Sequence, residues 1–470
     1  MNCRPELSSP RGAPARGAVF RAWLLLGALI CLASLPAYAA PRSDAVLIEG
    51  VTLIDGTGSP PQPNMWVLVE AGRFARISNT PLRAARHVTR VDGRGKFLIP
   101  GMMDVHIHLL GGGAWRDSSA QSDRAVDFDV GLRTLHGFLY YGFTTVYDAG
   151  NHPPFIMTLR DRERRGEIVS PRLFATGRLL SYPGSWSVGY AGIGVRDWPE
   201  TIADLDEQLS LQPDVQKITY ETMGVGPNPL VKSLPKELMR QMIEYLHERG
   251  VRTTAHVSNE QLARDAIAAG IDSLAHVPAT GVLTREFVEL VAAKRLPIQT
   301  SLAVFDEIIA MREGVDFLRT PEYRAVVDAR EPQVREQARQ RYLKLGWPDW
   351  FAAIYPYAAR NLQRIHAAGG LLVLGTDRSF APAALRELEL VVAAGIPPLD
   401  ALRIATLNGA IFLGRESELG SIEAGKLADM VLLNADPTRD IRHVRDIAGV
   451  WKAGVAIDRA ALQLPINGRP

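Results

Sequence analysis

The stretch Leu98-Ile-Pro-Gly-Met-Met-Asp-Val-His106-Ile-His108 decides the fold of this 470-residue chain. It begins as an apolar run, which is typical of a buried strand, and it ends on two histidines. Side chains two apart in a strand point to the same side, so His106 and His108 share one face. Two imidazoles on one face form half of a metal site, although a His-x-His pair alone is a weak indication of one.

An apolar strand followed by a helical segment recurs through residues 98–416. Strands are predicted near residues 98–107, 142–147, 171–176, 213–219, 251–256, 271–275, 297–302 and 371–376. Amphipathic helices are predicted between many of them, for example at Glu260–Ala269, Arg285–Ala293 and Ala358–Ala368. Eight strand-then-helix units predict the α/β fold class, with parallel strands closing into a (β/α)8 TIM-type barrel.

Three further candidate metal ligands directly follow predicted strands. His256 ends Val251-Arg-Thr-Thr-Ala-His, His276 ends Ile271-Asp-Ser-Leu-Ala-His, and Asp377 ends Leu371-Leu-Val-Leu-Gly-Thr-Asp. The carboxyl ends of the strands in such a barrel meet at one mouth, so these side chains are expected to face His106 and His108. Imidazole and carboxylate ligands suit zinc and similar divalent ions.

Lys217 ends the fourth predicted strand, in Asp214-Val-Gln-Lys217. A buried lysine opposite metal ligands is costly as a cation, because desolvation and like-charge repulsion both oppose its charge. A neutral amine can react with carbon dioxide to give a carbamate, whose two oxygens could bridge two metal ions. The competing reading is an ordinary surface or salt-bridged lysine; the strand-end position favours the carbamate.

Both chain ends carry short strands instead of strand-helix units. Strands are expected at Ala45–Ile48, Val51–Ile54, Met65–Val69, Phe74–Ile77, Met430–Leu433, Ile447–Trp451 and Val455–Asp458. Neither end has enough strands for a stable sheet of its own. Residues 40–97 and 417–470 are therefore predicted to form one small β-sandwich, with the barrel inserted between them.

The segment from Val304 to Tyr357 is too long for a simple loop and is charged and helical in pattern. It is predicted to be an insertion after the seventh strand. Its aromatic residues, such as Trp347 and Phe351, either pack the insertion onto the barrel, which is the favoured reading, or line a lid over an apolar substrate.

Residues 1–39 have the pattern of a secretory signal peptide. Arginines precede an apolar run from Ala22 to Leu35, and Ala37-Tyr-Ala39 is a small-x-small cleavage pattern. Cleavage after Ala39 predicts an exported protein, periplasmic or secreted, with no membrane association afterwards; an uncleaved N-terminal anchor is the alternative. Both cysteines, Cys3 and Cys31, lie in this segment, so the mature protein would have no thiolate for catalysis or metal binding.

The composition excludes some classes of partner. Apolar residues make up 47% and charged residues 22% of the chain, as in a soluble globular protein. The formal net charge is +2, without the strongly basic balance typical of nucleic-acid binders. The expected partner is a small molecule or short peptide, and a homo-oligomer is left open.

These residues resemble the pattern of the amidohydrolase superfamily. The resemblance covers essentially the whole mature chain and is closest to the imidazolonepropionase-related, Xaa-Pro dipeptidase-like branch. It rests on Leu98–His108, Lys217, His256, His276, Gly375-Thr-Asp377 and the stretch from Ala401 to Asp429, which contains Gly420-Ser-Ile-Glu-Ala-Gly-Lys-Leu-Ala-Asp429. The resemblance implies two divalent ions, usually zinc. It places the first on His106, His108 and Asp377, the second on His256 and His276, and a carboxylated Lys217 between them.

The implied reaction is hydrolysis by a metal-bridging hydroxide. Paired metal ions lower the pKa of a shared water from near 16 toward about 7. Asp377 is the expected catalytic residue, taking the proton of the nucleophile and passing it to the leaving group. The sequence contains no Gly-x-Ser-x-Gly motif, which argues against a serine nucleophile.

The bonds expected to be cleaved are amide bonds of small peptides or N-acyl amino acids. A non-catalytic scaffold is disfavoured, because all six ligand positions are filled. A lactone, a cyclic amide or an organophosphate ester remains the alternative substrate for the same centre. Deamination is less favoured, because single-metal deaminases of the superfamily do not need the lysine on strand four.

Three residues near the predicted strand ends are candidates for substrate binding: His152, Tyr220 and Arg378. Arg378 could donate a fork of hydrogen bonds to a substrate carboxylate, or form a structural ion pair. The chain departs from its relatives nearby. Ser258 stands where many have a histidine or tyrosine, and Tyr182-Pro-Gly-Ser replaces a Gly-Gly-His stretch, so a relative's substrate cannot simply be transferred.

Overall fold

The protein is described by a computed structural model that covers residues 45–112, 126–189, 191–222, 230–314, 320–327 and 331–464. These residues belong to one compact unit. The predicted signal peptide, residues 1–39, lies outside the described part. Among the helices of the described residues, none has both the length and the apolar character needed to cross a membrane.

Parallel strands form the centre of the chain, and each predicted strand position contains one. The eight are β6 (Met102–Ile107), β7 (Phe143–Asp148), β8 (Arg172–Ala175), β11 (Val215–Thr219), β12 (Arg252–His256), β13 (Ser273–Leu274), β14 (Ile298–Gln299) and β15 (Leu372–Val373). They pair in the order β6-β7-β8 and, with the short strands β9 (Leu179–Ser181) and β10 (Gly192–Gly194), in the order β10-β9-β11-β12-β13-β14-β15. The order follows the chain, as in a TIM-type arrangement.

Hydrogen bonds also join the first and last of these strands. Val105 N donates to Leu374 O over 2.9 Å, and Asp377 N donates to His106 O over 2.7 Å. On the other side, Asp214 N donates to Ala175 O over 3.0 Å, which connects the end of β8 to the start of β11. The strand that carries the two histidines therefore lies beside the strand that carries Asp377.

The strand predicted over 98–107 is wrong as a single element, because the structure divides it. β5 (Phe97–Pro100) pairs with strands from the chain ends, and β6 begins at Met102. The two meet at Pro100-Gly101, where a Cβ on Gly101 would lie 2.1 Å from Oγ1 of Thr144. Only glycine lets the chain pass so close to β7 while it changes sheets.

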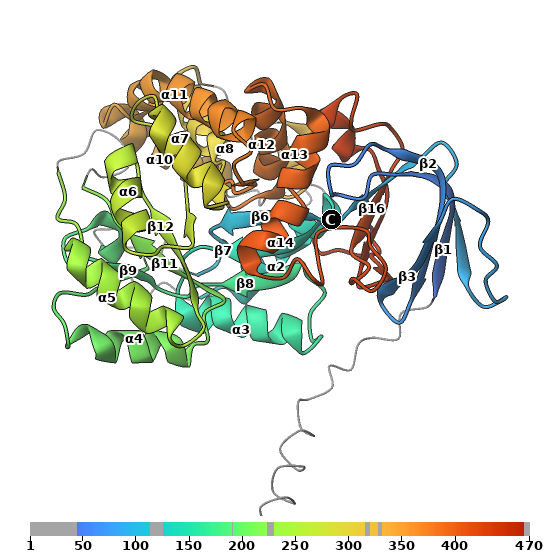
Figure 1. Ribbon diagram of the computed structural model, residues 1–470, viewed down its shortest axis with the longest axis horizontal. Coiled ribbons are helices and arrows are strands. Elements are labelled where there is room, and N and C mark those ends of the chain that lie inside the picture. Colours follow the sequence, from blue (N-terminus) through green and yellow to red (C-terminus); the bar gives the residue numbers. More distant parts are fainter. Residues whose placement is uncertain are drawn as a thin grey trace, which may run out of the picture. The chain divides into compact units, whose positions relative to one another are not determined.

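Helices follow most of the central strands. They are α2 (Phe128–Tyr140), α3 (Pro153–Arg164), α4 (Thr201–Ser210), α5 (Lys236–His247), α6 (Glu260–Ala268), α7 (Arg285–Ala293), α12 (Ala381–Ala393), α13 (Pro398–Ile404) and α14 (Leu407–Leu413). A 3-10 turn, η1 (Trp186–Gly189), lies between β9 and β10. Figure 1 shows the helices arranged around the central strands, with α3, α4 and α5 along one side and α7 and α12 along another. Apolar residues of strands and helices share one large buried cluster.

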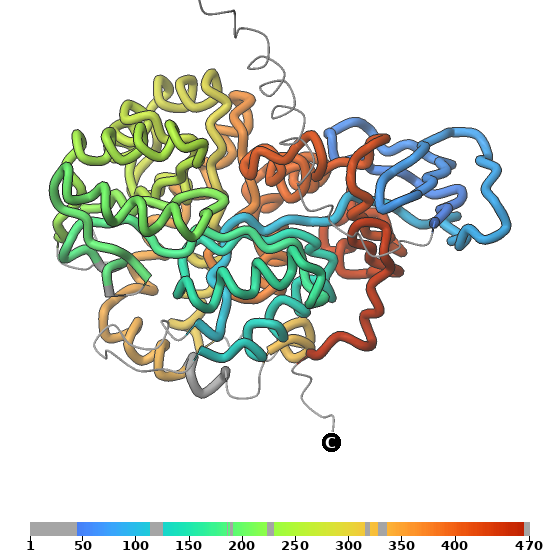
Figure 2. The backbone as a smooth tube through the Cα atoms, turned by 90° about the horizontal axis from the view of Figure 1, so that it is seen from below, coloured from blue at the N-terminus to red at the C-terminus, as the bar shows by residue number. Residues whose placement is uncertain are grey.

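The two chain ends meet in one sheet of eight strands. It contains β1 (Val46–Leu53), β2 (Gln62–Glu70), β3 (Arg73–Ser78), β4 (Thr89–Asp92), β5, β16 (Met430–Leu433), β17 (Ile447–Lys452) and β18 (Val455–Ala456). A further 3-10 turn, η3 (Ile441–Arg445), precedes β17. The direct link is the antiparallel pairing of β5 with β16, and the first and last coloured segments lie side by side in Figure 2. Strands from the two chain ends thus lie in a single hydrogen-bonded sheet, whereas the predicted sandwich would have two.

A bulge in β1 accounts for this continuity. Two strands were expected on either side of Glu49-Gly50, but β1 runs through both, with irregular register between Ile48 and Val51. Gly50 has a φ of +69°, which glycine adopts without strain. The first half of β1 pairs with β4 and the second half with β5, so one bulged strand joins all three.

The insertion after the seventh strand is helical, as predicted. It contains α8 (Leu302–Ala310), α9 (Pro321–Arg324), α10 (Glu331–Lys344) and α11 (Trp347–Ala367). The expected helix start at Ala358 is wrong, because α11 runs through Pro356 without a break. The rings of Phe305 and Phe351 lie 4.9 Å apart, and those of Tyr342 and Trp347 stack at 4.7 Å, so these aromatic side chains pack the insertion together.

Candidate metal centre

His106 lies in β6 and His108 directly follows the strand, and both side chains are buried. Nδ1 of His106 lies 3.0 Å from Ala275 O, and Nδ1 of His108 lies 2.9 Å from Gly150 O. A carbonyl oxygen can only accept, so each Nδ1 carries the proton and each Nε2 keeps its lone pair. Backbone contacts of this kind orient metal-binding histidines and fix their tautomers.

Asp377 brings a carboxylate to these two Nε2 atoms. Its Oδ1 lies 3.1 Å from Nε2 of His108 and 3.5 Å from Nε2 of His106. Asp377 has a φ of +56°, a left-handed conformation that aspartate tolerates better than most residues. This turn, four residues beyond the end of β15, directs the carboxylate to the histidines at the end of the neighbouring strand.

Lys217 completes this side of the cluster. It lies within β11, its side chain is buried, and its Nζ is 2.7 Å from Nε2 of His106. Burial lowers the pKa of the Lys217 amine from 10.5 to about 8. A substantial fraction of the amine is therefore neutral near pH 8, which is the form that can attack carbon dioxide.

The four histidines form a continuous row. Ring centroids are 5.3 Å apart between His108 and His106, 4.8 Å between His106 and His276, and 4.7 Å between His276 and His256. Burial lowers the pKa of His276 to about 3, and it also lowers the pKa values of His106 and His256. All three imidazoles are neutral at pH 7, which is the form that binds metal.

The donor set fits a divalent metal ion. One ligand atom each from His106, His276 and Asp377 all lie within 4.8 Å of one another, the one such group found among the described residues. This group draws one imidazole from each of the two expected pairs. The structure therefore brings the six predicted side chains together, while their division between two ions stays a prediction.

The candidate substrate-binding residues are placed differently. Tyr220 is buried, and its hydroxyl donates to Asp265 on α6 over 3.2 Å. Arg378 forms a buried ion pair with Glu307 of α8, with Nε 2.8 Å from Oε2. Each thus has a protein partner, and for Arg378 the structural ion pair is the reading that the geometry favours.

His152 is the exposed member of the three. It precedes α3, and desolvation, followed by the charge of Arg178, lowers the pKa of its imidazole. Contact between His152 and the substrate stays a prediction.

Sequence reasoning missed two buried carboxylates next to the cluster. Asp104 accepts from Oγ1 of Thr376 over 2.7 Å and from the backbone N–H of His106 over 3.1 Å, which joins the ends of β6 and β15. Glu221 places Oε2 3.6 Å from Nε2 of His256. The signal was available, since Asp104 stands two residues before His106 and Glu221 four residues after Lys217.

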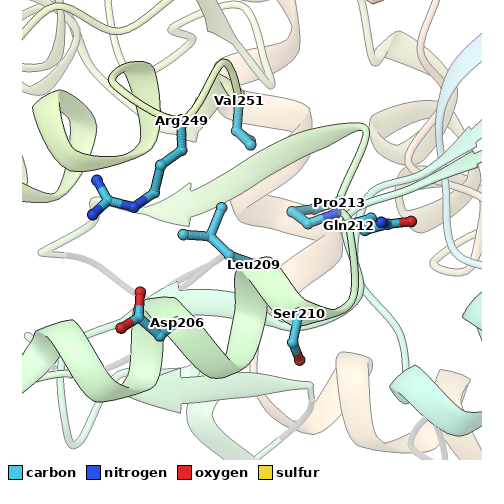
Figure 3. A pocket seen from close by; sticks show the side chains of 7 residues that line it. All are labelled: Asp206, Leu209, Ser210, Gln212, Pro213, Arg249 and Val251. Atoms are coloured by element: carbon cyan, nitrogen blue, oxygen red, sulfur yellow. The ribbon is translucent and has the colours of Figure 1, made fainter. Parts of the chain in front are cut away.

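A surface hollow of about 650 Å³ lies elsewhere, next to the amino ends of β11 and β12. Figure 3 shows its lining side chains, among them Asp206, Leu209 and Arg249. Asp206 accepts from the hydroxyl of Tyr245, and the guanidinium of Arg249 lies 3.3 Å from the centre of that ring. These polar groups satisfy one another, so the hollow offers no obvious chemistry.

Comparisons with known proteins agree with the geometry. The profile of the amidohydrolase family matches residues 97–457. Ochratoxinase of Aspergillus niger is 24% identical over 454 residues, covering 88% of this chain and 86% of the relative. Imidazolonepropionase of Alkaliphilus oremlandii is 22% identical over 387 residues, covering 79% and 84%. A solved Xaa-Pro dipeptidase with bound methionine superposes with a TM-score of 0.69, 22% identity and coverage of 88% and 100%, which shows a shared TIM-barrel-type α/β fold.

Proposed function

The chain belongs to the amidohydrolase family and is a hydrolase, and we propose that it cleaves amide bonds of small peptides or N-acyl amino acids at a binuclear metal centre. The observation that carries this proposal is the contact of Lys217 Nζ with His106 Nε2, 2.7 Å apart, in a cluster of buried neutral imidazoles. A structural lysine would gain only that one hydrogen bond while burying its charge, whereas a carbamate precursor needs an amine at this place.

The residues divide by role. His106, His108 and Asp377 would hold one divalent ion, His256 and His276 would hold the other, and Lys217, once converted to a carbamate by carbon dioxide, would supply a ligand to both. When bound, the two ions, expected to be Zn²⁺, acidify water and polarise the scissile carbonyl. This arrangement assumes that the eight parallel strands close completely into a barrel.

Asp377 is the proposed proton carrier. Its carboxylate lies beside two imidazole Nε2 atoms, where attacking water would be held, and it accepts the proton of that water. It then delivers the proton to the leaving amine, so that the amine departs as a neutral group. The likeness to a Xaa-Pro dipeptidase supports the choice of amide over ester.

A substrate screen tests the proposal. Purified protein loaded with zinc is incubated with dipeptides, N-acyl amino acids, lactones and phosphotriesters, and its metal content is measured by mass spectrometry. Two ions per chain and amide hydrolysis are expected. Hydrolysis of lactones or phosphotriesters alone would replace the amide substrate and leave the centre in place, whereas a protein without metal or activity would refute both.

Export is a separate proposal. Residues 1–39 are proposed to be removed after Ala39, which delivers the mature enzyme to the periplasm or the medium. Intact mass measurement of the protein from its own host checks the cleavage site. A full-length mass in the membrane fraction would favour the uncleaved anchor.

A further inference from the structure

Glu221 is a buried carboxylate that the proposed reaction does not use. It follows the end of β11 and is 1% exposed. Strand register explains its place, because Thr219 pairs with His256 and Tyr220 N donates to His256 O over 3.1 Å. The chain then turns, and the Glu221 side chain comes to lie next to the His256 ring.

The two carboxylate oxygens have different surroundings. Oε1 accepts from the backbone N–H of Thr222 over 2.8 Å, which anchors the group. Oε2 lies 3.6 Å from Nε2 of His256. That distance is slightly too long for a hydrogen bond. A small rotation of either side chain would close it.

Glu221 could in principle bind metal directly, but the geometry argues against this. Oε1 is held by the backbone N–H of Thr222, and the contact of Oε2 with the cluster is with Nε2 of His256. The carboxylate is thus close to one nitrogen of His256 without joining the other imidazoles. A carboxylate in that place is better suited to orient the ring than to bind an ion.

His106 and His108 show the complementary arrangement. Each uses Nδ1 for a backbone carbonyl and directs Nε2 to the cluster. His256 instead has its nearby acceptor at Nε2. A metal-binding histidine commonly donates the N–H of its other nitrogen to such an acceptor, which raises the basicity of the ligand nitrogen.

We propose that Glu221 is a positioning residue, which accepts the Nε2–H of His256 and so leaves Nδ1 of that ring as the ligand atom. The inference rests on the proposed metal centre. It assigns His256 the tautomer opposite to that of His106 and His108. A carboxylate suits this position because its negative charge raises the basicity of the imidazole nitrogen that binds the metal.

The test compares Glu221→Gln and Glu221→Ala with wild type, using zinc affinity measured by competition with a chelator. Outer partners of this kind typically contribute 10- to 100-fold to metal affinity. We expect one of the two ions to bind about 10-fold more weakly in Glu221→Gln and up to about 100-fold more weakly in Glu221→Ala. Glu237→Gln, on the exposed face of α5, is the matched control and should bind both ions as wild type does.

A second readout separates positioning from simple stability. In zinc-loaded protein with ¹⁵N-labelled histidine, long-range ¹H–¹⁵N spectra report which ring nitrogen carries the proton. The resonance that disappears in His256→Gln should show a protonated Nε2 in wild type and should shift in Glu221→Gln. Unchanged zinc affinity in both Glu221 variants, or a proton on Nδ1 of His256, overturns the inference. Loss of thermal stability in the metal-free variant alone would also count against it. Wild type that binds no zinc would instead overturn the metal centre itself.

Discussion

At the scale of single residues, Lys217 is the most informative side chain. Lysines are seldom buried without a partner, and here the side chain ends at an imidazole nitrogen instead of a carboxylate. Burial lowers the pKa of its amine, and its position among the metal-ligand candidates is the one that the proposed carbamate requires.

Replacement of Lys217 by alanine should remove one or both ions and lower kcat/KM by at least about 100-fold. Residues that only hydrogen-bond to metal ligands already contribute up to about 100-fold, so loss of a ligand should cost no less. Metal analysis and kinetics check this outcome. Short-chain carboxylic acids, which can take the place of the carbamate, should restore part of the activity. Lys236→Ala, an exposed lysine paired with Asp265, is the control. Full activity in Lys217→Ala would exclude the carbamate.

Asp377→Asn should separate proton transfer from metal binding. Asparagine keeps the shape of the side chain and one ligand oxygen but cannot accept a proton as a carboxylate does. We expect kcat to fall by about 10²- to 10⁴-fold, the usual contribution of a general base. Steady-state kinetics at matched zinc content provide the measurement, and an unchanged kcat would reassign the proton carrier.

At the scale of elements, the insertion is fixed to the strand ends by buried carboxylates. Glu387 of α12 accepts from the backbone N–H groups of Leu302 and Ala303 at the start of α8. Ser301, just before, has a φ of +48° and provides no side-chain cap, so Glu387 takes over that function. Together with the Arg378–Glu307 pair, this ties α8 to the strand ends that carry the candidate metal ligands.

Glu387 should make stability depend on pH. Burial raises its pKa from 4.5 to about 7. An acid whose pKa is higher in the folded state favours folding while protonated, so its contribution is present below pH 4.5 and is lost as the pH rises to 7. The loss is about 3 kcal/mol for a shift of this size.

The difference in free energy of unfolding between wild type and Glu387→Gln, measured from pH 5 to 8, isolates this effect. Wild type should lose stability relative to the variant across that range, since glutamine cannot ionise. Glu286→Gln, exposed on α7, should show a constant difference from wild type. If the free energies of unfolding of wild type and Glu387→Gln changed in parallel with pH, the raised pKa of Glu387 would be contradicted.

At the scale of the whole molecule, buried ion pairs connect the central strands to the sheet built from the chain ends. Arg172 of β8 donates to both oxygens of Asp429 over 3.1 and 3.2 Å. Lys452 of β17 pairs with Glu163 of α3 at 2.6 Å. Gly142 adds an apolar contact, since a Cβ there would lie 2.9 Å from Val431. The end sheet therefore supports the strands that carry the candidate metal ligands.

Asp429→Ala should weaken this junction without touching the cluster. It leaves Arg172 without its carboxylate and Ala453 N without its acceptor, so we expect the free energy of unfolding to fall by about 3 kcal/mol or more. Denaturant unfolding measures the change, while zinc stoichiometry should stay as in wild type. Glu418→Gln breaks an exposed pair with Arg415 and should have little effect. Loss of zinc in Asp429→Ala would show that the end sheet shapes the centre directly.

The sequence by itself determined the strand-helix order and the six candidate ligands. Both are local properties: apolar periodicity marks each strand, and a ligand directly after a strand must lie at its carboxyl end. The family resemblance followed from those residues and is confirmed by the profile match over 97–457.

Only the tertiary structure decided the partners of the remaining polar groups. Arg378 pairs with Glu307, Tyr220 with Asp265, and Glu221 lies beside His256, each across a large separation in the chain or a turn that no periodicity reveals. The single end sheet likewise depends on a bulge at Gly50 and on pairing between β5 and β16. Strand register and side-chain packing set these contacts, and both arise only when distant segments meet.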